Sequence, residues 1–289
     1  MRTAIITDSN SGIFEQEGRD MGVFVIPMPV ILDSVIYFEG KDISHDAFFR
    51  WLSEGKPAST SQPGIGDVLR MWDTVLESGY EDAVYIPMSS GLSGSCHMAQ
   101  GMAQEYGGRI AVVDNHRISV TLRHAVQDAL ALREQGLNAA QIKEVLEKTA
   151  YDSIVYVGVG TLEYLKAGGR VTSAGAALGT MLNIKPLLVI EGERLDAYAK
   201  VRGAKPCQKR LIQAMQDYAE RLTSNGSAIR IGAAGSFADP EKNAEWEASV
   251  KEAFPNHMIK YDPLSFSIAC HVGPDAFGMG ISRKITGRG

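Results

Sequence analysis

Short apolar runs alternate with helical patterns along the first half of the chain. Residues 3–7 (TAIIT), 83–88 (AVYIPM) and 110–113 (IAVV) are compact apolar runs, and turn residues follow each of them. Runs of this length bounded by turn residues are typical of buried strands. The repeated order of strand, turn and helical spacing predicts right-handed βαβ units and a parallel sheet.

Polar clusters stand where these three strands end. Residues 8–9 (DS) follow the first strand, residues 89–95 (SSGLSGS) the second and residues 114–116 (DNH) the third. Ligands of parallel α/β sheets bind beyond the carboxyl ends of the strands. We therefore expect a ligand site at this edge of the sheet.

The second half of the chain has a different pattern. Residues 154–159 predict a strand, and the apolar runs 184–190 and 195–201 flank the sequence EGER at 191–194, which is typical of a hairpin turn. Two long helical stretches and further short strands follow. A hairpin combined with helices in this order predicts an α+β domain.

The composition agrees with a two-domain globular protein. The chain has 289 residues, of which 45% are hydrophobic, and an average domain has about 150 residues. This apolar content excludes intrinsic disorder. A helical segment separates the halves, so we expect an N-terminal, mainly parallel α/β domain over residues 1–152 and a C-terminal α+β domain over residues 153–289.

Composition also indicates the cellular location and the kinds of partner to expect. No apolar stretch approaches the ~18 residues of a membrane span, and the chain reaches Asp8 before any signal-peptide core, so we expect a cytoplasmic protein. A formal net charge of −5 argues against a general nucleic-acid binder. Cys96, Cys207 and Cys270 are widely spaced, and neither they nor the six histidines follow a metal or disulfide pattern. We expect reduced thiols and no metal.

The serine-rich loop at 89–95 is the strongest local signal. Gly91 and Gly94 allow sharp turns, and four hydroxyls stand beside a predicted helix N-terminus, where free N–H groups favour an anion. The same residues are also typical of a rich helix cap. A nucleophile elbow is excluded, because Ser95 stands where the G-x-S-x-G pattern requires glycine.

Two further segments offer polar side chains. Thr60 and Ser61 lie in a T-S-Q-P segment that, by itself, is typical of a cap before the following helix. His271 lies in a C-H-V-G-P segment, where a turn would hold its imidazole near a loop. The basic residues Arg170 and Arg202 are typical of solvated faces, but together they could receive a phosphate or an acidic partner.

These residues resemble the motifs of the DegV family, whose members include the fatty acid-binding subunits of a bacterial fatty acid kinase. The matching segments follow the family's order over nearly the whole chain. They are Thr7-Asp8-Ser9, Thr60-Ser61-Gln62-Pro63, residues 89–94 (SSGLSG), Val113-Asp114, residues 162–170 (LEYLKAGGR), Ile184-Lys185-Pro186 and His271-Val272-Gly273-Pro274. The last segment departs from the family's usual H-T-G-P-G at Val272 and Asp275.

The resemblance implies a long-chain fatty acid in the cleft between two domains, with no further cofactor and no catalytic residue of this chain's own. It nominates four residues for the carboxylate: Thr60, Ser61, Ser93 and His271. It also nominates a supporting set in the loops around them: Gly91, Leu92, Gly94 and Gly273.

The resemblance implies a partner as well. A fatty acid kinase would phosphorylate the bound carboxylate to an acyl phosphate, with Arg170 and Arg202 near the kinase or the phosphate. Lipid exchange implies a transient contact with a membrane surface. From the residues alone, two other classes remain open: a hydrolase or transferase using Ser93 with His271, and a regulator that binds a phosphate ligand at the serine loop.

Overall fold

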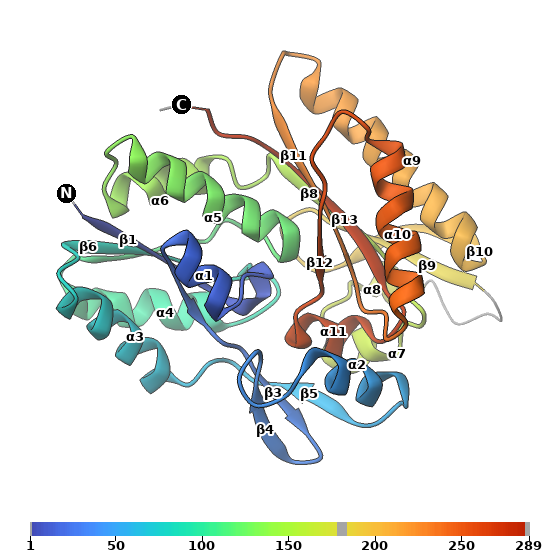
Figure 1. The fold of residues 1–289 in the computed structure, drawn as a ribbon, viewed down its shortest axis with the longest axis horizontal. Coiled ribbons are helices and arrows are strands. Elements are labelled where there is room, and N and C mark those ends of the chain that lie inside the picture. The colour runs from blue at the N-terminus through green and yellow to red at the C-terminus, as the bar shows by residue number, and fades with distance from the viewer. Residues whose placement is uncertain (1, 178–183, 287–289) are drawn as a thin grey trace.

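The computed structural model describes residues 2–177 and 184–286. It contains two large sheets that lie side by side, each covered by helices, and a small third sheet at the lower edge of the view (Figure 1). Helix α5 (Ser119–Glu134) lies between the two large sheets and contacts strands of both. In the described part of the chain, no helix combines the length and apolar character needed to cross a membrane.

The first large sheet confirms the predicted parallel architecture. Its four strands run in the order β2-β1-β6-β7, and every pair is parallel. The strands are β1 (Thr3–Asp8), β2 (Val23–Ile26), β6 (Asp82–Ile86) and β7 (Ile110–Val112). Around them lie α1 (Glu15–Met21), α3 (Ile65–Glu77), α4 (Ser95–Ala103), α6 (Ala139–Lys148) and the short 3-10 helices η1 (Ser9–Ser11) and η2 (Gln104–Tyr106).

The small third sheet is absent from the sequence-based prediction. It is antiparallel with the order β4-β3-β5, and α2 (His45–Ser53) lies beside it. The strands are β3 (Pro29–Leu32), β4 (Val35–Phe38) and β5 (Ala58–Thr60). The interpretation of 60–63 as a helix cap is wrong, because Thr60 ends a strand and α3 begins at Ile65 after the N-cap residue Gly64, with no side-chain cap hydrogen bond.

The second large sheet has six strands in the order β10-β9-β8-β13-β11-β12. It is antiparallel except for the parallel pair β11–β12, and its β9–β10 hairpin confirms the predicted turn. The strands are β8 (Ser153–Gly158), β9 (Ile184–Ile190), β10 (Asp196–Arg202), β11 (Ile229–Gly235), β12 (Lys260–Pro263) and β13 (Phe277–Arg283). The helices are α7 (Glu163–Gly168), α8 (Ser173–Ala176), α9 (Ala204–Thr223), α10 (Pro240–Ala253) and α11 (Phe266–Val272).

Helix α11 corrects the expected turn at His271. The Ser265 hydroxyl accepts a 3.3 Å hydrogen bond from the Ile268 N–H and so caps the start of this helix. Gly273 ends it with a φ of +78°. His271 therefore lies in the last helical turn, where the backbone fixes its direction more firmly than a loop would.

Three apolar clusters hold the layers together. One fills the space between the first sheet and α3 and α4, and another lies between the second sheet and α9 and α10. The largest contains side chains of both halves, such as Ile5 of β1 and Val155 of β8. The predicted domain boundary after residue 152 falls between α6 and β8 and stays a prediction. The shared core joins the halves across it.

Candidate functional site

A cavity of about 310 Å³ lies between the two halves of the molecule. Its walls are mainly apolar, and both halves supply them. They include Met28, Met88, Leu92, Ile118, Val120, Val155, Val157, Leu165, Ile190, Leu195, Leu264, Ile268, Val272 and Met279. The polar side chains in the wall are Thr60, Ser61, Gln62, Ser93, Ser119, Arg170, Ser267 and His271. A largely apolar cavity with a few polar groups is the usual form of a small-molecule site.

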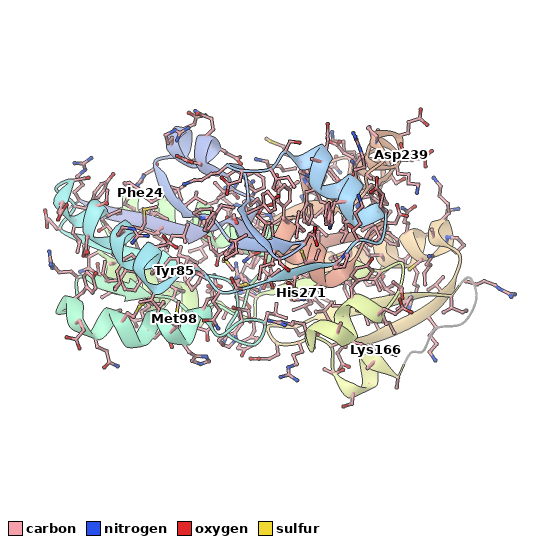
Figure 2. The ribbon with its side chains drawn as sticks, turned by 90° about the horizontal axis from the view of Figure 1, so that it is seen from below. Phe24, Tyr85, Met98, Lys166, Asp239 and His271 are labelled. Carbon is pink, nitrogen blue, oxygen red and sulfur yellow. The ribbon has the colours of Figure 1, made fainter. Side chains whose placement is uncertain are left out.

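His271 occupies a central position in the molecule. Figure 2 shows it between the half that contains Tyr85 and Met98 and the half that contains Lys166 and Asp239. The helix that carries it, α11, contacts β5 and β3 of the small sheet and α7 of its own half. A side chain in this place can bring groups from both halves to one ligand.

Thr60 and His271 form the contact at the centre of the polar group. Thr60 Oγ1 lies 3.0 Å from His271 Nε2, although 211 positions separate them in the sequence. Burial and, second, the nearby cation of Arg170 lower the pKa of His271 to about 4. The imidazole is therefore neutral at pH 7.

Two further polar side chains of the wall are held by backbone groups nearby. Arg170 Nε donates a 3.3 Å hydrogen bond to the Leu92 carbonyl, next to Ser93. Ser93 Oγ accepts a 3.2 Å hydrogen bond from the Ser95 N–H at the start of α4. Thr60, Ser61, Ser93, Arg170 and His271 all line the same cavity. The structure thus brings these five predicted residues together.

Close packing explains why two positions of the serine loop are occupied by glycine. A Cβ on Gly94 would lie 2.5 Å from Gln62 Nε2, and a Cβ on Gly91 would lie 2.8 Å from the Cα of Glu193. Both distances are shorter than real Cβ contacts allow. Gly94 therefore lets Gln62 approach the loop, and Gly91 lets the tip of the β9–β10 hairpin approach it.

Not every predicted residue reaches the cavity. Arg202 is exposed at the end of β10 and does not line it. Gly273 packs against Tyr164, where an added Cβ would lie 2.5 Å from Cδ2. Of the two departures from the family pattern, Val272 is buried in the cavity wall, whereas Asp275 is exposed and pairs with Lys242 at 3.0 Å.

Sequence reasoning missed two hydroxyls in the cavity wall, those of Ser119 and Ser267. Ser119 opens α5, shortly after the polar cluster at 114–116. Ser267 precedes His271 by four residues and so shares its face of α11. The expected polar cluster at the end of β1 has a structural role instead, because Asp8 is buried and accepts hydrogen bonds from the Met88 N–H, at 2.9 Å, and from the Asn10 N–H.

The arrangement suits anion binding better than nucleophilic catalysis. The lowered pKa makes His271 a weak base, and its Nε2 faces Thr60 rather than Ser93. Among the described residues no carboxylate makes a hydrogen bond to His271, and no group of three or more His, Cys, Asp or Glu side chains could hold a metal ion. Arg170 has no acidic partner within the described ranges. Hydroxyls, an imidazole and an unneutralised guanidinium together favour a carboxylate or a phosphate.

Comparison with known proteins places the chain in a family. A protein-family model described as "Uncharacterised protein, DegV family" matches residues 2–284 of the chain. A DegV domain-containing protein of Deinococcus radiodurans is 30% identical over 282 residues, which are 97% of this chain and 98% of the relative. One from Streptococcus pyogenes is 27% identical over 99% of this chain and 100% of the relative.

Solved structures show the same fold. A structure from Thermus thermophilus, described as fatty acid binding of a DegV family protein, has a TM-score of 0.86 and 31% identity, covering 98% of this chain and 100% of its own. A DegV lipid binding protein from Thermotoga maritima has a TM-score of 0.82 and 24% identity, covering 98% and 99%. Four of the seven family segments, those at 60–63, 89–94, 162–170 and 271–274, contribute to the cavity wall. Together with these matches over the whole length they lead to one assignment: the chain belongs to the DegV family.

Proposed function

We propose that this protein binds one long-chain fatty acid in the cavity between its halves. The observation that carries the proposal is the composition of the cavity wall, in which an extensive apolar lining surrounds a few polar side chains, among them the Thr60–His271 pair and Arg170. Thr60, Ser61, Ser93 and His271 would hold the carboxylate, and the apolar wall would hold the acyl chain. The fatty acid binding described for the Thermus thermophilus relative supports this proposal.

The physical chemistry of burial agrees with such a ligand. Each buried methylene contributes about 0.8 kcal/mol, so about 14 methylenes give about 11 kcal/mol as an upper bound. A carboxylate without hydrogen bonds would cost several kcal/mol in the same cavity. The hydroxyls of Thr60, Ser61 and Ser93, the neutral imidazole of His271 and the cation of Arg170 can offset that cost.

The proposal includes a partner. A fatty acid kinase would transfer a phosphoryl group to the bound carboxylate and form an acyl phosphate, while this chain presents the substrate and performs no catalysis itself. Arg170 in the cavity wall would face the carboxylate and the incoming phosphate, and the exposed Arg202 would contact the kinase. A transient contact with a membrane surface would supply and release the lipid.

Lipid extraction followed by a binding titration tests the proposal. The purified protein should carry a fatty acid that mass spectrometry identifies, and the delipidated protein should bind C14–C18 acids. Ser93→Ala and His271→Ala should each weaken binding about tenfold or more, because each removes a hydrogen bond to a charged group. Ser90→Ala, in the same loop but outside the cavity wall, should bind as the wild type does.

Two results would overturn the proposal. One is a folded, delipidated protein with no affinity for any C14–C18 acid. The other is a rise in the melting temperature caused by nucleotides and not by fatty acids, since a ligand that binds the folded state stabilises that state. That second result would favour the phosphate-binding regulator.

A further inference from the structure

Ser267 is a buried residue whose hydroxyl opens onto the cavity, and the proposed carboxylate site does not use this hydroxyl. The residue lies in the first turn of α11, is 5% exposed and lines the cavity. Within residues 2–177 and 184–286, its Oγ makes no hydrogen bond. A hydroxyl in a largely apolar cavity wall pairs with water or with a polar atom of the ligand, because a polar group without a partner costs free energy. The open direction for this hydroxyl is the cavity.

A role in the helix itself does not explain Ser267. A helical serine often bonds back to a carbonyl of the preceding turn, and Ser267 does not. The cap of α11 comes from Ser265, which accepts from the Ile268 N–H and donates a 2.9 Å hydrogen bond to Asn10 Oδ1. The Ser267 hydroxyl is therefore available to a ligand.

The position of Ser267 along α11 determines which part of the ligand its hydroxyl faces. Side chains four residues apart on a helix have their Cβ atoms about 5–6 Å apart on one face, so Ser267 lies one turn from His271. An extended chain advances about 1.2 Å per bond, which follows from the reach of about 3.3–3.6 Å over the three bonds of one residue. Of the distance of about 5–6 Å, a hydrogen bond from the Ser267 hydroxyl to a ligand oxygen spans about 3 Å. The remaining distance of about 2–3 Å corresponds to about two bonds, so with the carboxylate at His271 the Ser267 hydroxyl faces carbon 3 of the acyl chain.

The carboxylate does not require Ser267. Two carboxylate oxygens offer about four acceptor positions. Ser61, Ser93, Arg170 and one member of the hydrogen-bonded Thr60–His271 pair already supply four donor groups. The neighbours of Ser267 in the wall, such as Leu264 and Ile268, are apolar. A plain methylene beside Ser267 would leave its hydroxyl without a partner.

We propose that Ser267 forms a subsite for an oxygen on the acyl chain close to the carboxyl end, and that 3-hydroxy fatty acids are the preferred ligands of the cavity. This inference rests on the proposed fatty acid function and names its substrate class. The ligand hydroxyl would pair with Ser267 Oγ as donor or acceptor. A site that contains a buried polar group discriminates against analogues that leave this group unpaired.

A comparison of matched acids tests the subsite. Titrations of the delipidated full chain with 3-hydroxypalmitate, 12-hydroxypalmitate and palmitate should show about a tenfold preference for the 3-hydroxy acid, as expected for one additional hydrogen bond. Ser267→Ala should abolish this preference by weakening the binding of the 3-hydroxy acid alone. Ser119→Ala removes the other cavity hydroxyl that sequence reasoning missed, and it should keep the preference.

Each contrary outcome has a distinct meaning. Equal affinity of the wild type for palmitate and 3-hydroxypalmitate overturns the subsite and leaves the fatty acid function intact. An equal loss of affinity for palmitate and 3-hydroxypalmitate in a folded Ser267→Ala variant also overturns the subsite, because the hydroxyl would then bind the carboxylate. Failure of the wild type to bind any of the three acids contradicts the proposed function itself.

Discussion

Ser89 of the serine loop donates a 2.6 Å hydrogen bond from its hydroxyl to the carbonyl oxygen of Gly192, at the tip of the β9–β10 hairpin. The same Oγ accepts a 3.1 Å hydrogen bond from the Gly91 N–H. Ile190 and Leu195, on either side of this tip, line the cavity. One buried side chain therefore joins the two halves beside the proposed ligand.

Replacement of Ser89 should loosen this connection. Ser89→Ala leaves the Gly192 carbonyl and the Gly91 N–H without their partner, which we expect to lower the free energy of unfolding by about 1–3 kcal/mol. Urea unfolding measures this loss. Stopped-flow displacement of a fluorescent fatty acid should also show faster release. Ser90→Ala is the control, because the Ser90 hydroxyl has no hydrogen bond within the described ranges; equal effects of both variants would contradict this prediction.

Arg170 should influence the protonation of His271. Burial is the larger cause that lowers the pKa of His271 to about 4, and the Arg170 cation is the second. Arg170→Met removes the repulsion of the imidazolium, so the pKa of His271 should rise, by about one unit or less because burial remains. NMR titration of the imidazole measures the shift. Lys166→Met, on the exposed side of α7, should leave it unchanged, and an unaltered pKa in Arg170→Met would refute the effect.

A buried ion-pair network holds α5 against the second half. The Arg123 side chain is 3% exposed, and its Nη1 lies 2.8 Å from Glu17 Oε1 and its Nε 2.8 Å from Asp262 Oδ2. Removal of one member of a buried network leaves uncompensated charges, so Arg123→Ala should cost about 3–5 kcal/mol of stability.

The control for this network is an exposed pair of similar length. Arg19 lies 2.7 Å from Glu15, with 57% of its side chain exposed. Arg19→Ala should change the free energy of unfolding by about 0.5 kcal/mol or less. Calorimetry or urea unfolding of both variants provides the comparison, and a similar loss in both would show that burial does not determine the strength of the network.

The parallel sheet was predictable from local pattern, and the small sheet was not. Strand β1 is a continuous apolar run that ends in turn residues, so its sequence alone indicates a buried strand. Strand β5 has three residues, Ala58–Thr60, without a buried side chain among them. It forms only because β3 pairs with it. Such tertiary pairing leaves no periodic signal in the sequence.

The candidate site shows the same division. The serine loop and the Thr60 segment were recognisable as motifs, but the 3.0 Å contact between Thr60 and His271 depends on packing of α11 against β5. Ser267 was missed because no helix was predicted over residues 266–272, and only the segment from Cys270 onward was interpreted, as a turn. With α11 recognised, its spacing of four residues from His271 would have indicated a shared face.

Arg202 provides a test that separates ligand binding from presentation to a kinase. It is exposed at the end of β10 and lies outside the cavity wall. Arg202→Ala should therefore bind palmitate as the wild type does, while acyl phosphate formation by a fatty acid kinase should fall at least tenfold. Isothermal titration and a coupled phosphorylation assay measure the two effects. Lost lipid binding in a folded Arg202→Ala variant would contradict this division of roles.

Glu39 should make the stability of the fold depend on pH. Its Oε1 accepts a 2.6 Å hydrogen bond from the Phe266 N–H at the start of α11. Burial raises the pKa of Glu39 from 4.5 to about 8. Between these values the folded chain keeps a proton that the unfolded chain has released, so stability is lost as the pH rises through this interval. Asp8 acts in the same direction, but its pKa is raised only to about 6.

The interval from pH 7 to 8 therefore isolates Glu39. Buried histidines with lowered pKa values lose stability only below their ordinary value of 6.5 and do not contribute here. The free energy of unfolding of the wild type should fall by about 1 kcal/mol over this one pH unit, and Glu39→Gln, which has no proton to release, should remove the decline. Glu144→Gln removes the charge of an exposed carboxylate on α6 and should leave the decline unchanged. Urea unfolding at both pH values decides, because a decline that persists in Glu39→Gln would assign the released proton to another group.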